Sequence, residues 1–212
     1  MKYYIDLGAY DGNLLEQVIK KYPDFDYYIA FELIPILYKE MKKRFRNNKK
    51  VKIYRKVVST RNKKKVKFYI CYCTEKGGCK GKGKEIGTGS TLLNRKKTGN
   101  IKKSRYIYVE TINFSEYVKE NFSKDNFIVL KIDIEGEEYP LLEYMIQTGA
   151  IFYINKIYCE WHFHKLDKRG KKNNPNQERH NKLIKKLNKI GFELTGVNTK
   201  DELDYLLKTE RI

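Results

Sequence analysis

Glycines and aspartates follow the first expected strand in a pattern suited to holding a nucleoside. Residues 3–5 predict a short buried strand, and Asp6 leads from it into a turn that contains Gly8 and Gly12. Because glycine has no Cβ atom, such a turn can bend sharply and a ligand can approach its backbone closely. Asp11 also lies in the turn, so the site is acidic and suits a ribose or a cation better than a phosphate.

A further acidic residue follows the next expected strand. Residues 27–31 predict that strand, and Glu32 comes directly after it. In a doubly wound sheet, an acidic residue about twenty positions beyond the glycine turn hydrogen-bonds the ribose diol of a nucleotide. The plainer interpretation is that the glycines serve only packing and that Glu32 is a solvated cap. The spacing of the acidic residues favours nucleoside binding.

Two later strands also end in side chains that can do chemistry. Residues 127–132 are apolar except for Lys131 and are followed by Asp133, and a later apolar strand is followed by Glu160 and His162. In an open α/β sheet, ligands bind outside the carboxyl ends of the strands. This rule collects the following residues along one edge of the sheet: Asp6, Gly8, Asp11, Glu32, Ser59, Asp133, Glu160 and His162.

Hydrophobic periodicity and the positions of glycine and proline predict an alternating α/β chain. At 212 residues and 25.3 kDa, the chain has the size of one domain. The stretch 73–97 is rich in glycine and lysine and too polar to pack, so we expect a mobile surface loop or lid there. The expected helices span residues 13–21, 36–46, 114–122, 135–148 and 177–190. The expected strands span residues 3–5, 27–31, 50–58, 65–72, 105–111, 127–132, 154–159, 192–197 and 203–208.

Four of these segments resemble a known family. IDLGAYDG at 5–12 resembles motif I of class I S-adenosylmethionine methyltransferases, and FEL at 31–33 resembles their acidic second-strand motif. KIDIEGEE at 131–138 narrows the resemblance to the FkbM family, and GTGSTLLN at 87–94 resembles a Ser-Leu segment found in the same place in that family. The resemblance implies a single methyltransferase domain over the whole chain, with a Rossmann-like α/β fold. Its central sheet would have about seven mostly parallel strands, an antiparallel last strand and helices on both faces.

The resemblance also implies a cofactor, S-adenosylmethionine, at the carboxyl ends of the first three strands. The residues expected to bind it are Asp6, Gly8, Ala9, Tyr10, Asp11, Gly12, Glu32, Leu33, Val58, Ser59 and Asp133.

Transfer of a methyl group to a hydroxyl requires removal of a proton, by a general base or by a divalent cation that lowers the pKa of the hydroxyl. We expect Asp133, Glu135 and His162 to be catalytic. Some metal-dependent O-methyltransferases carry their cation at the ends of the same two strands, so the resemblance implies a Mg²⁺ or Mn²⁺ site at Asp133, Glu160 and His162. One alternative is that His162 or Glu135 acts as a base without metal. Another is that Glu160 has only the role of pairing with Lys131, while His162 only packs against Trp161.

The expected activity is O-methylation of a hydroxyl on a sugar or glycan. Compact, lysine-rich family members of large algal viruses methylate capsid-glycan sugars such as rhamnose, and the chain resembles these in overall character. The rivals are an RNA 2′-O-methyltransferase and a non-catalytic cofactor-binding module. The RNA enzymes usually have a lysine before the first strand as part of a Lys-Asp-Lys-Glu set, and only Met1 and Lys2 precede residue 3 here. Intact carboxylates at 133, 135 and 160 oppose the second rival.

Charge and cysteine content leave two questions open. The formal net charge of +19 suits a polyanionic partner, but a genome rich in A and T produces the same bias. Cys71, Cys73 and Cys79 form either a zinc site lacking a fourth ligand at finger spacing, or a set of partly buried strand cysteines. No apolar run approaches a membrane span and no export signal is recognised, so we expect the cytoplasm, or the host cytoplasm for a viral protein.

Overall fold

The computed structural model describes residues 1–71, 90–92, 104–163, 175–194 and 206. Among these residues, five parallel strands form a central sheet in the order β3-β2-β1-β7-β8. The order reverses direction between β1 and β7, which is where doubly wound folds bind their ligands. The bounds are Lys2–Leu7 for β1, Tyr27–Phe31 for β2, Val51–Tyr54 for β3, Phe127–Ile132 for β7 and Lys156–Cys159 for β8.

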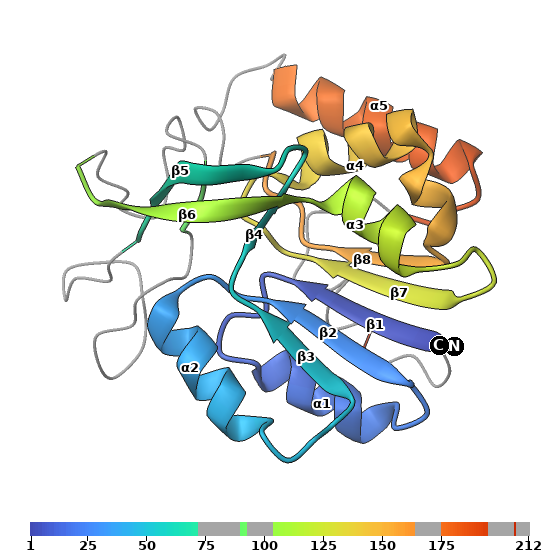
Figure 1. Ribbon diagram of the computed structural model, residues 1–212. Coiled ribbons are helices and arrows are strands. Elements are labelled where there is room, and N and C mark those ends of the chain that lie inside the picture. Colours follow the sequence, from blue (N-terminus) through green and yellow to red (C-terminus); the bar gives the residue numbers. More distant parts are fainter. Residues whose placement is uncertain (72–89, 93–103, 164–174, 195–205, 207–212) are drawn as a thin grey trace.

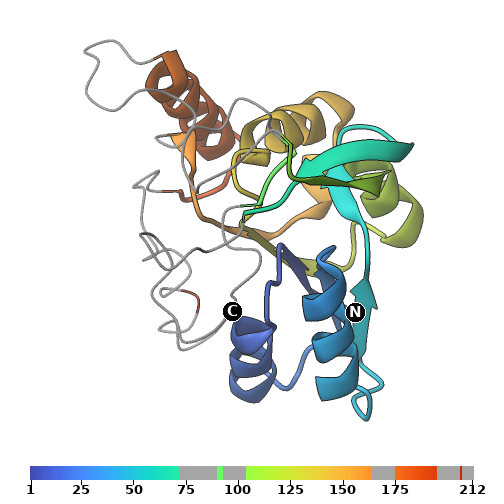
Figure 2. The same ribbon diagram turned by 90° about the vertical axis from the view of Figure 1, so that its left-hand side faces the viewer.

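Helices cover both faces of the central sheet (Figure 1). Seen from the side, α1 and α2 form one layer, and α3, α4 and α5 lie beyond the opposite face (Figure 2). Proline at the first position of α2 supplies a preset helical φ, and glycine at residue 149 ends α4 with a φ of +76°. The bounds are Asn13–Lys21 for α1, Pro35–Arg44 for α2, Phe114–Asn121 for α3, Glu138–Thr148 for α4 and Pro175–Lys189 for α5, with a 3₁₀ turn η1 at Ala150–Tyr153.

Side chains of the central strands alternate between two buried layers, because successive residues of a strand point to opposite faces. In β1, Ile5 and Leu7 pack in the layer under α3 and α4, whereas Tyr4 packs in the layer under α1 and α2. Asp6 shares the face of Tyr4 by the same alternation. Lys131 of β7 is the register partner of Asp6, so a buried lysine and a buried aspartate meet side by side inside the protein.

A second, three-stranded sheet has the order β4-β6-β5 and lies over the carboxyl ends of the central strands (Figure 1). It corrects the expectation of one continuous strand over 50–58. The chain leaves the central sheet after β3, and Val57 and Val58 then bury their side chains in two different core clusters while pairing with β6. Both faces of this short strand are therefore covered. The bounds are Val57–Ser59 for β4, Lys63–Tyr69 for β5 and Tyr106–Asn113 for β6.

The expected strand count is also corrected within the described part of the chain. The expected antiparallel last strand, 203–208, lies outside the described residues except for Leu206. Residues 192–194 are irregular, because the Asn188 side chain occupies both backbone groups of Leu194, donating to its carbonyl and accepting from its N–H, each at 3.0 Å. Leu206, expected in a strand, is helical, and its carbonyl accepts from the Tyr22 hydroxyl at 2.7 Å. The remainder of 195–212 lies outside the described residues.

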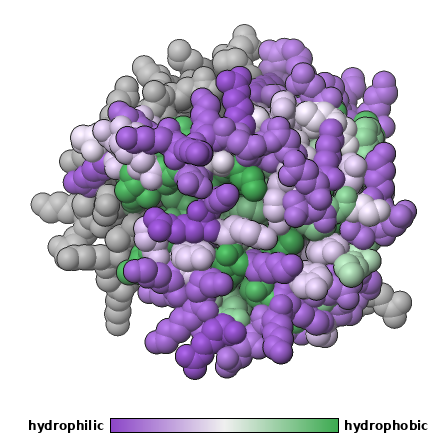
Figure 3. Space-filling model, viewed as in Figure 1, coloured by the Kyte–Doolittle hydropathy of each residue, from purple (hydrophilic) through white to green (hydrophobic). Residues whose placement is uncertain are grey.

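Hydrophilic side chains cover most of the surface seen in Figure 3. On the small sheet, the ammonium groups of Lys65 and Lys67 lie over the rings of Tyr108 and Tyr106, at 4.5 and 4.2 Å. Such cation–π contacts keep long charged side chains on an outer face. None of the described helices is long and apolar enough to cross a membrane.

Candidate active site

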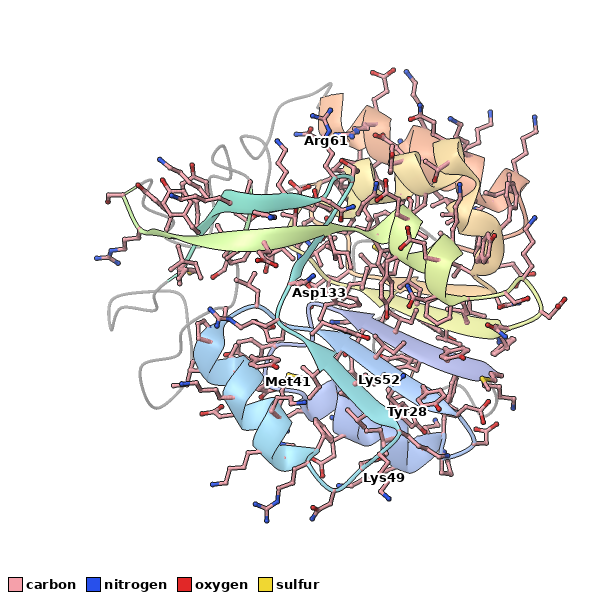
Figure 4. The ribbon with its side chains drawn as sticks, in the orientation of Figure 1. Tyr28, Met41, Lys49, Lys52, Arg61 and Asp133 are labelled. Carbon is pink, nitrogen blue, oxygen red and sulfur yellow. The ribbon has the colours of Figure 1, made fainter. Side chains whose placement is uncertain are left out.

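A cavity opens where the carboxyl ends of β1, β2 and β7 meet the small sheet. Figure 4 shows Asp133 near the middle of the molecule at this junction. The lining residues that the sequence predicts for the cofactor or for catalysis are Gly8, Tyr10, Glu32, Leu33, Val58, Asp133 and Glu135. Much of the remaining wall is apolar and comes from the small sheet and its surroundings, including Ile34, Val57, Phe68 and Leu92, with Ser90 and Lys56 beside them.

Gly8 is required by the close approach of the first turn to β7. Its φ is +81°, and a Cβ atom built there would lie 2.0 Å from the carbonyl oxygen of Asp133. No side chain fits in that space, and L-residues rarely adopt that φ. The glycine therefore lets the turn after β1 and the end of β7 lie against each other.

Glu32 is held beneath the turn by backbone amides. Its Oε2 accepts from the N–H of Tyr10 at 2.9 Å and its Oε1 accepts from the N–H of Ile34 at 2.7 Å. Burial raises the pKa of this carboxyl to about 7, although both hydrogen bonds act to lower it. Because each carboxylate oxygen can accept a second hydrogen bond, the group can still receive the hydroxyls of a ribose.

Lys131 joins the turn after β1 to the end of β7. Its ammonium donates to the Gly8 carbonyl at 2.7 Å and lies 2.9 Å from Asp6 and 3.6 Å from Asp133. Burial alone would lower the pKa of this lysine, but the two carboxylates outweigh it and the pKa is raised. The charge that the sequence places in an apolar strand is thus compensated within the site.

His162 is fully buried and surrounded by four carboxylates. Its Nδ1 donates to Oε1 of Glu138 at 2.7 Å, and its Nε2 lies 3.2 Å from Glu160. Carboxylates of Asp133 and Glu135 approach the same Nε2 at 3.8 Å each. The imidazole is therefore the point at which the ends of β7 and β8 and the start of α4 converge.

These surroundings raise the pKa values of both His162 and Asp133. Burial disfavours the charged imidazole of His162, but Glu138 outweighs it, with Glu160 and Glu135, and the pKa rises to about 10. For Asp133, burial is the largest influence, opposed by Lys131 and reinforced by Glu160, and the pKa rises to about 6. At neutral pH, without a metal, the site holds an imidazolium beside carboxylates.

Asp133, Glu135 and His162 are close enough to share a cation, since one ligand atom of each lies within 4.8 Å of the others. The predicted metal set has Glu160 in place of Glu135. Glu160 contacts the same imidazole nitrogen, so its role as a ligand stays a prediction. The closest carboxylates to the Lys131 ammonium are Asp6 and Asp133 instead of Glu160.

A family model described as the methyltransferase FkbM domain matches residues 6–194. The chain belongs to this family. Among solved structures, the methyltransferase FkbM from Methylobacillus flagellatus KT is similar, with 11% sequence identity and a TM-score of 0.39. The similar region covers 71% of this chain and 31% of that one. No curated protein matches the chain. The FkbM resemblance is thus confirmed as a family, and the algal-virus sugar kind stays a prediction.

Other residues of this FkbM domain that the sequence predicts to bind the cofactor are not among those that line the cavity, namely Asp6, Ala9, Asp11, Gly12 and Ser59. Asp11 accepts from the backbone N–H of Asn13 at 2.9 Å, which organises the first turn of α1. Gly12 has a φ of +76° and lies against α2, and Ala9 is buried in the core. Ser59 pairs with β6. Cys71 is buried, and Cys73 and Cys79 lie outside the described residues, as do most of 73–97.

Two features of the site were not assigned from the sequence. Glu138, the fully buried partner of His162, is part of the KIDIEGEE motif, but a run of three acidic residues does not reveal which one turns inward. Phe68 and the segment 90–92 form a wall of the cavity. Their distance in the chain from the strand ends hides this role. For 90–92 the structure corrects the expectation that 73–97 is too polar to pack, since Ser90 and Thr91 are buried and Thr91 pairs with Tyr69 of β5.

Proposed function

We propose that the protein is an S-adenosylmethionine-dependent O-methyltransferase that acts on a hydroxyl of a sugar or glycan, with rhamnose as the first acceptor to test. The observation that carries the proposal is a cavity lined by Glu32 together with Asp133 and Glu135, in a chain of the FkbM family. A nucleoside site and a set of titratable groups thus face the same space.

The cofactor end fits the chemistry of S-adenosylmethionine. Glu32 has acceptor capacity for the ribose hydroxyls, and Leu33, Val57 and Val58 supply an apolar wall for the adenine. S-adenosylmethionine, when bound, supplies an activated methyl group bearing positive charge. The carboxylates farther along the cavity provide a negative environment for that charge.

Asp133 is the group best suited to accept the proton of the acceptor hydroxyl. With its pKa raised to about 6, it is ionised at neutral pH but remains more basic than an ordinary aspartate. His162, with a pKa of about 10, carries its proton at neutral pH and holds the surrounding carboxylates in place. The Glu135 carboxylate, which approaches the same Nε2 as that of Asp133, orients the hydroxyl.

The charge of the cavity favours a neutral acceptor. Glu32, Asp133, Glu135 and Glu137 line it, whereas Lys56 is the basic residue among its described walls. A hydroxyl flanked by phosphates, as in RNA, would meet these carboxylates at short range. Lysines such as Lys65 and Lys67 lie on the outer face of the small sheet, so part of the net positive charge is away from the reaction.

A divalent cation also fits the site. Asp133, Glu135 and His162 would hold Mg²⁺ or Mn²⁺, with Glu160 as a further candidate ligand. Glu138 already receives Nδ1–H of His162, which is how metal-bound histidines are commonly oriented, and this leaves Nε2 for the ion. The cation would then replace a proton on Nε2 and lower the pKa of the acceptor hydroxyl.

Two experiments test the proposal. Calorimetry measures the binding of S-adenosylhomocysteine, and an assay with labelled S-adenosylmethionine measures methyl transfer to a panel of rhamnosides, other glycosides and RNA. We expect cofactor binding, turnover on a glycoside that is indifferent to salt, and a loss of turnover of at least about a hundredfold in Asp133→Asn. Turnover only on RNA, with steep salt dependence, would point to the nucleic-acid rival. Cofactor binding without any acceptor would point to a binding module, and unchanged turnover in excess EDTA would exclude the metal.

A further inference from the structure

The short segment 90–92 is built into the small sheet beside the cavity. Thr91 forms both backbone hydrogen bonds of an antiparallel bridge with Tyr69 of β5, at 2.9 and 3.0 Å. Next to it, the Ser90 hydroxyl accepts from the N–H of Cys71 at 2.9 Å. Ser90 and Leu92 line the cavity, so this segment is part of the wall that encloses the ligand.

The middle residue of this segment contacts the catalytic loop. The Thr91 side chain is fully buried, and its hydroxyl donates to the backbone carbonyl of Glu135 at 3.0 Å. That hydrogen bond links two parts of the chain that are 44 positions apart. The wall of the cofactor cavity and the loop after β7 are thereby fastened together.

Glu135 has a backbone conformation that needs such support. Its φ is +56°, in the left-handed region, which is unfavourable for a residue with a Cβ atom. The next residue, Gly136, has a φ of +112° and donates its N–H to the Glu138 carboxylate at 2.9 Å. The loop is thus held from below by Glu138 and from the small sheet by Thr91.

The strained backbone determines where the Glu135 carboxylate lies. In this conformation the side chain lines the cavity and approaches Nε2 of His162 at 3.8 Å. A change in the peptide orientation at this residue would move the carboxylate away from Asp133 and the imidazole. Outliers of this kind persist when surrounding contacts over-determine them, and they gather at functional sites.

We propose, on the basis of the methyl transfer proposed above, that Thr91 is a positioning residue that acts through Glu135. Its hydroxyl holds the left-handed conformation that brings the Glu135 carboxylate to the reacting hydroxyl. Because Thr91 lies between Ser90 and Leu92, which line the cavity, its hydrogen bond links that wall to the loop that carries Glu135. Thr91 itself is not among the described residues that line the cavity.

Steady-state kinetics of Thr91→Val test the proposal, since valine keeps the shape and removes the donor. We expect kcat to fall about tenfold, with the dissociation constant of S-adenosylhomocysteine changed by less than about twofold. Thr91→Ser, which keeps the hydroxyl, should restore kcat. Thr111→Val is the matched control. The Thr111 hydroxyl donates to the Arg61 carbonyl at 2.6 Å, and neither residue lines the cavity, so the kcat of this variant should match that of the wild type.

The same substitution made in a Glu135→Gln variant separates an effect on the position of Glu135 from an effect on the stability of the fold. In Glu135→Gln, adding Thr91→Val should cause no further loss of kcat, because the group through which Thr91 acts has been removed. If the second substitution lowers kcat tenfold again, or if Thr91→Ser is as poor as Thr91→Val, Thr91 does not act through Glu135.

Amide hydrogen exchange gives a readout that does not depend on turnover. In Thr91→Val, exchange at Gly136 should become about tenfold faster, while the core strand β7 exchanges as in the wild type. Thr111→Val should leave Gly136 unchanged. If the wild type transfers no methyl group to any acceptor, the proposed function fails, and the exchange experiment still decides whether Thr91 holds the loop. Unchanged exchange at Gly136 would overturn the inference whatever the activity.

Discussion

Glu32 should make cofactor binding depend on pH near neutrality. Its pKa is raised to about 7 by burial, against the lowering effect of the amides of Ile34 and Tyr10. A ribose diol donates hydrogen bonds, and an ionised carboxylate is an acceptor only, so the bound state favours ionised Glu32. Protonation therefore competes with the cofactor, and affinity should rise as the pH increases through the pKa.

The size of the effect follows from the ionised fraction. A carboxyl with a pKa of about 7 is roughly one-tenth ionised at pH 6 and roughly nine-tenths ionised at pH 8. If the carboxylate is the binding form, the dissociation constant should be about tenfold larger at pH 6 than at pH 8, which corresponds to about 1.4 kcal/mol.

Isothermal titration calorimetry with S-adenosylhomocysteine at pH 6, 7 and 8, at constant ionic strength, measures this change. Glu32→Gln keeps the shape without a titrating group, so it should bind more weakly at pH 8 and lose most of the pH dependence. Asp133 lines the same cavity and has a pKa of about 6, so Asp133→Asn controls for its contribution. A wild-type affinity that is flat between pH 6 and 8, or a Glu32→Gln slope equal to that of the wild type, would refute the reasoning.

Other perturbations test the remaining features of the site. In urea unfolding, Gly8→Ala should destabilise the fold more than the matched Gly149→Ala. Both glycines have left-handed φ values (+81° and +76°), but a Cβ at Gly8 would lie 2.0 Å from a carbonyl oxygen, whereas a Cβ at Gly149 would meet nothing within 4 Å. Equal losses of stability would contradict the close approach at Gly8. In NMR titrations the imidazole of His162 should remain protonated to pH 8, since its pKa is raised to about 10, and Glu138→Gln should lower that pKa; an unchanged titration would exclude Glu138 as the cause. The raised pKa of Glu32 stabilises the fold below about pH 4.5, and this contribution is lost as the pH rises through about 7. The free energy of unfolding of the wild type, measured with urea and compared with that of Glu32→Gln, should therefore fall by about 3 kcal/mol from pH 4.5 to pH 8. A difference between the two proteins that does not change with pH would contradict the burial of an ionisable group.

Local sequence was sufficient for most elements and for the edge of the sheet on which the site lies. The strands 27–31 and 127–132 and the helix 13–21 have the predicted bounds, because uninterrupted apolar runs and amphipathic periodicity report burial directly. Strand ends are local features too. Glu32 and Asp133 were therefore predicted from their places after buried strands, and both line the cavity.

The end of the sheet could not be predicted in the same way. Residues 192–197 have the composition of a strand, but a side chain from the preceding helix takes the backbone groups of Leu194, and no local pattern reveals that competition. The break between β3 and β4 has a similar origin, since Val57 and Val58 are buried in separate clusters that form only when the small sheet lies over the central one.

The sequence by itself determined which residue types stand at the strand ends, because that depends on the order of apolar and polar residues along the chain. Only the tertiary structure decided which of them act together. Glu138 turns inward to His162, Thr91 reaches Glu135 from 44 positions away, and Lys131 balances Asp6 across two strands. Each of these pairings depends on distances set by the packing of whole layers, which no short stretch of sequence encodes.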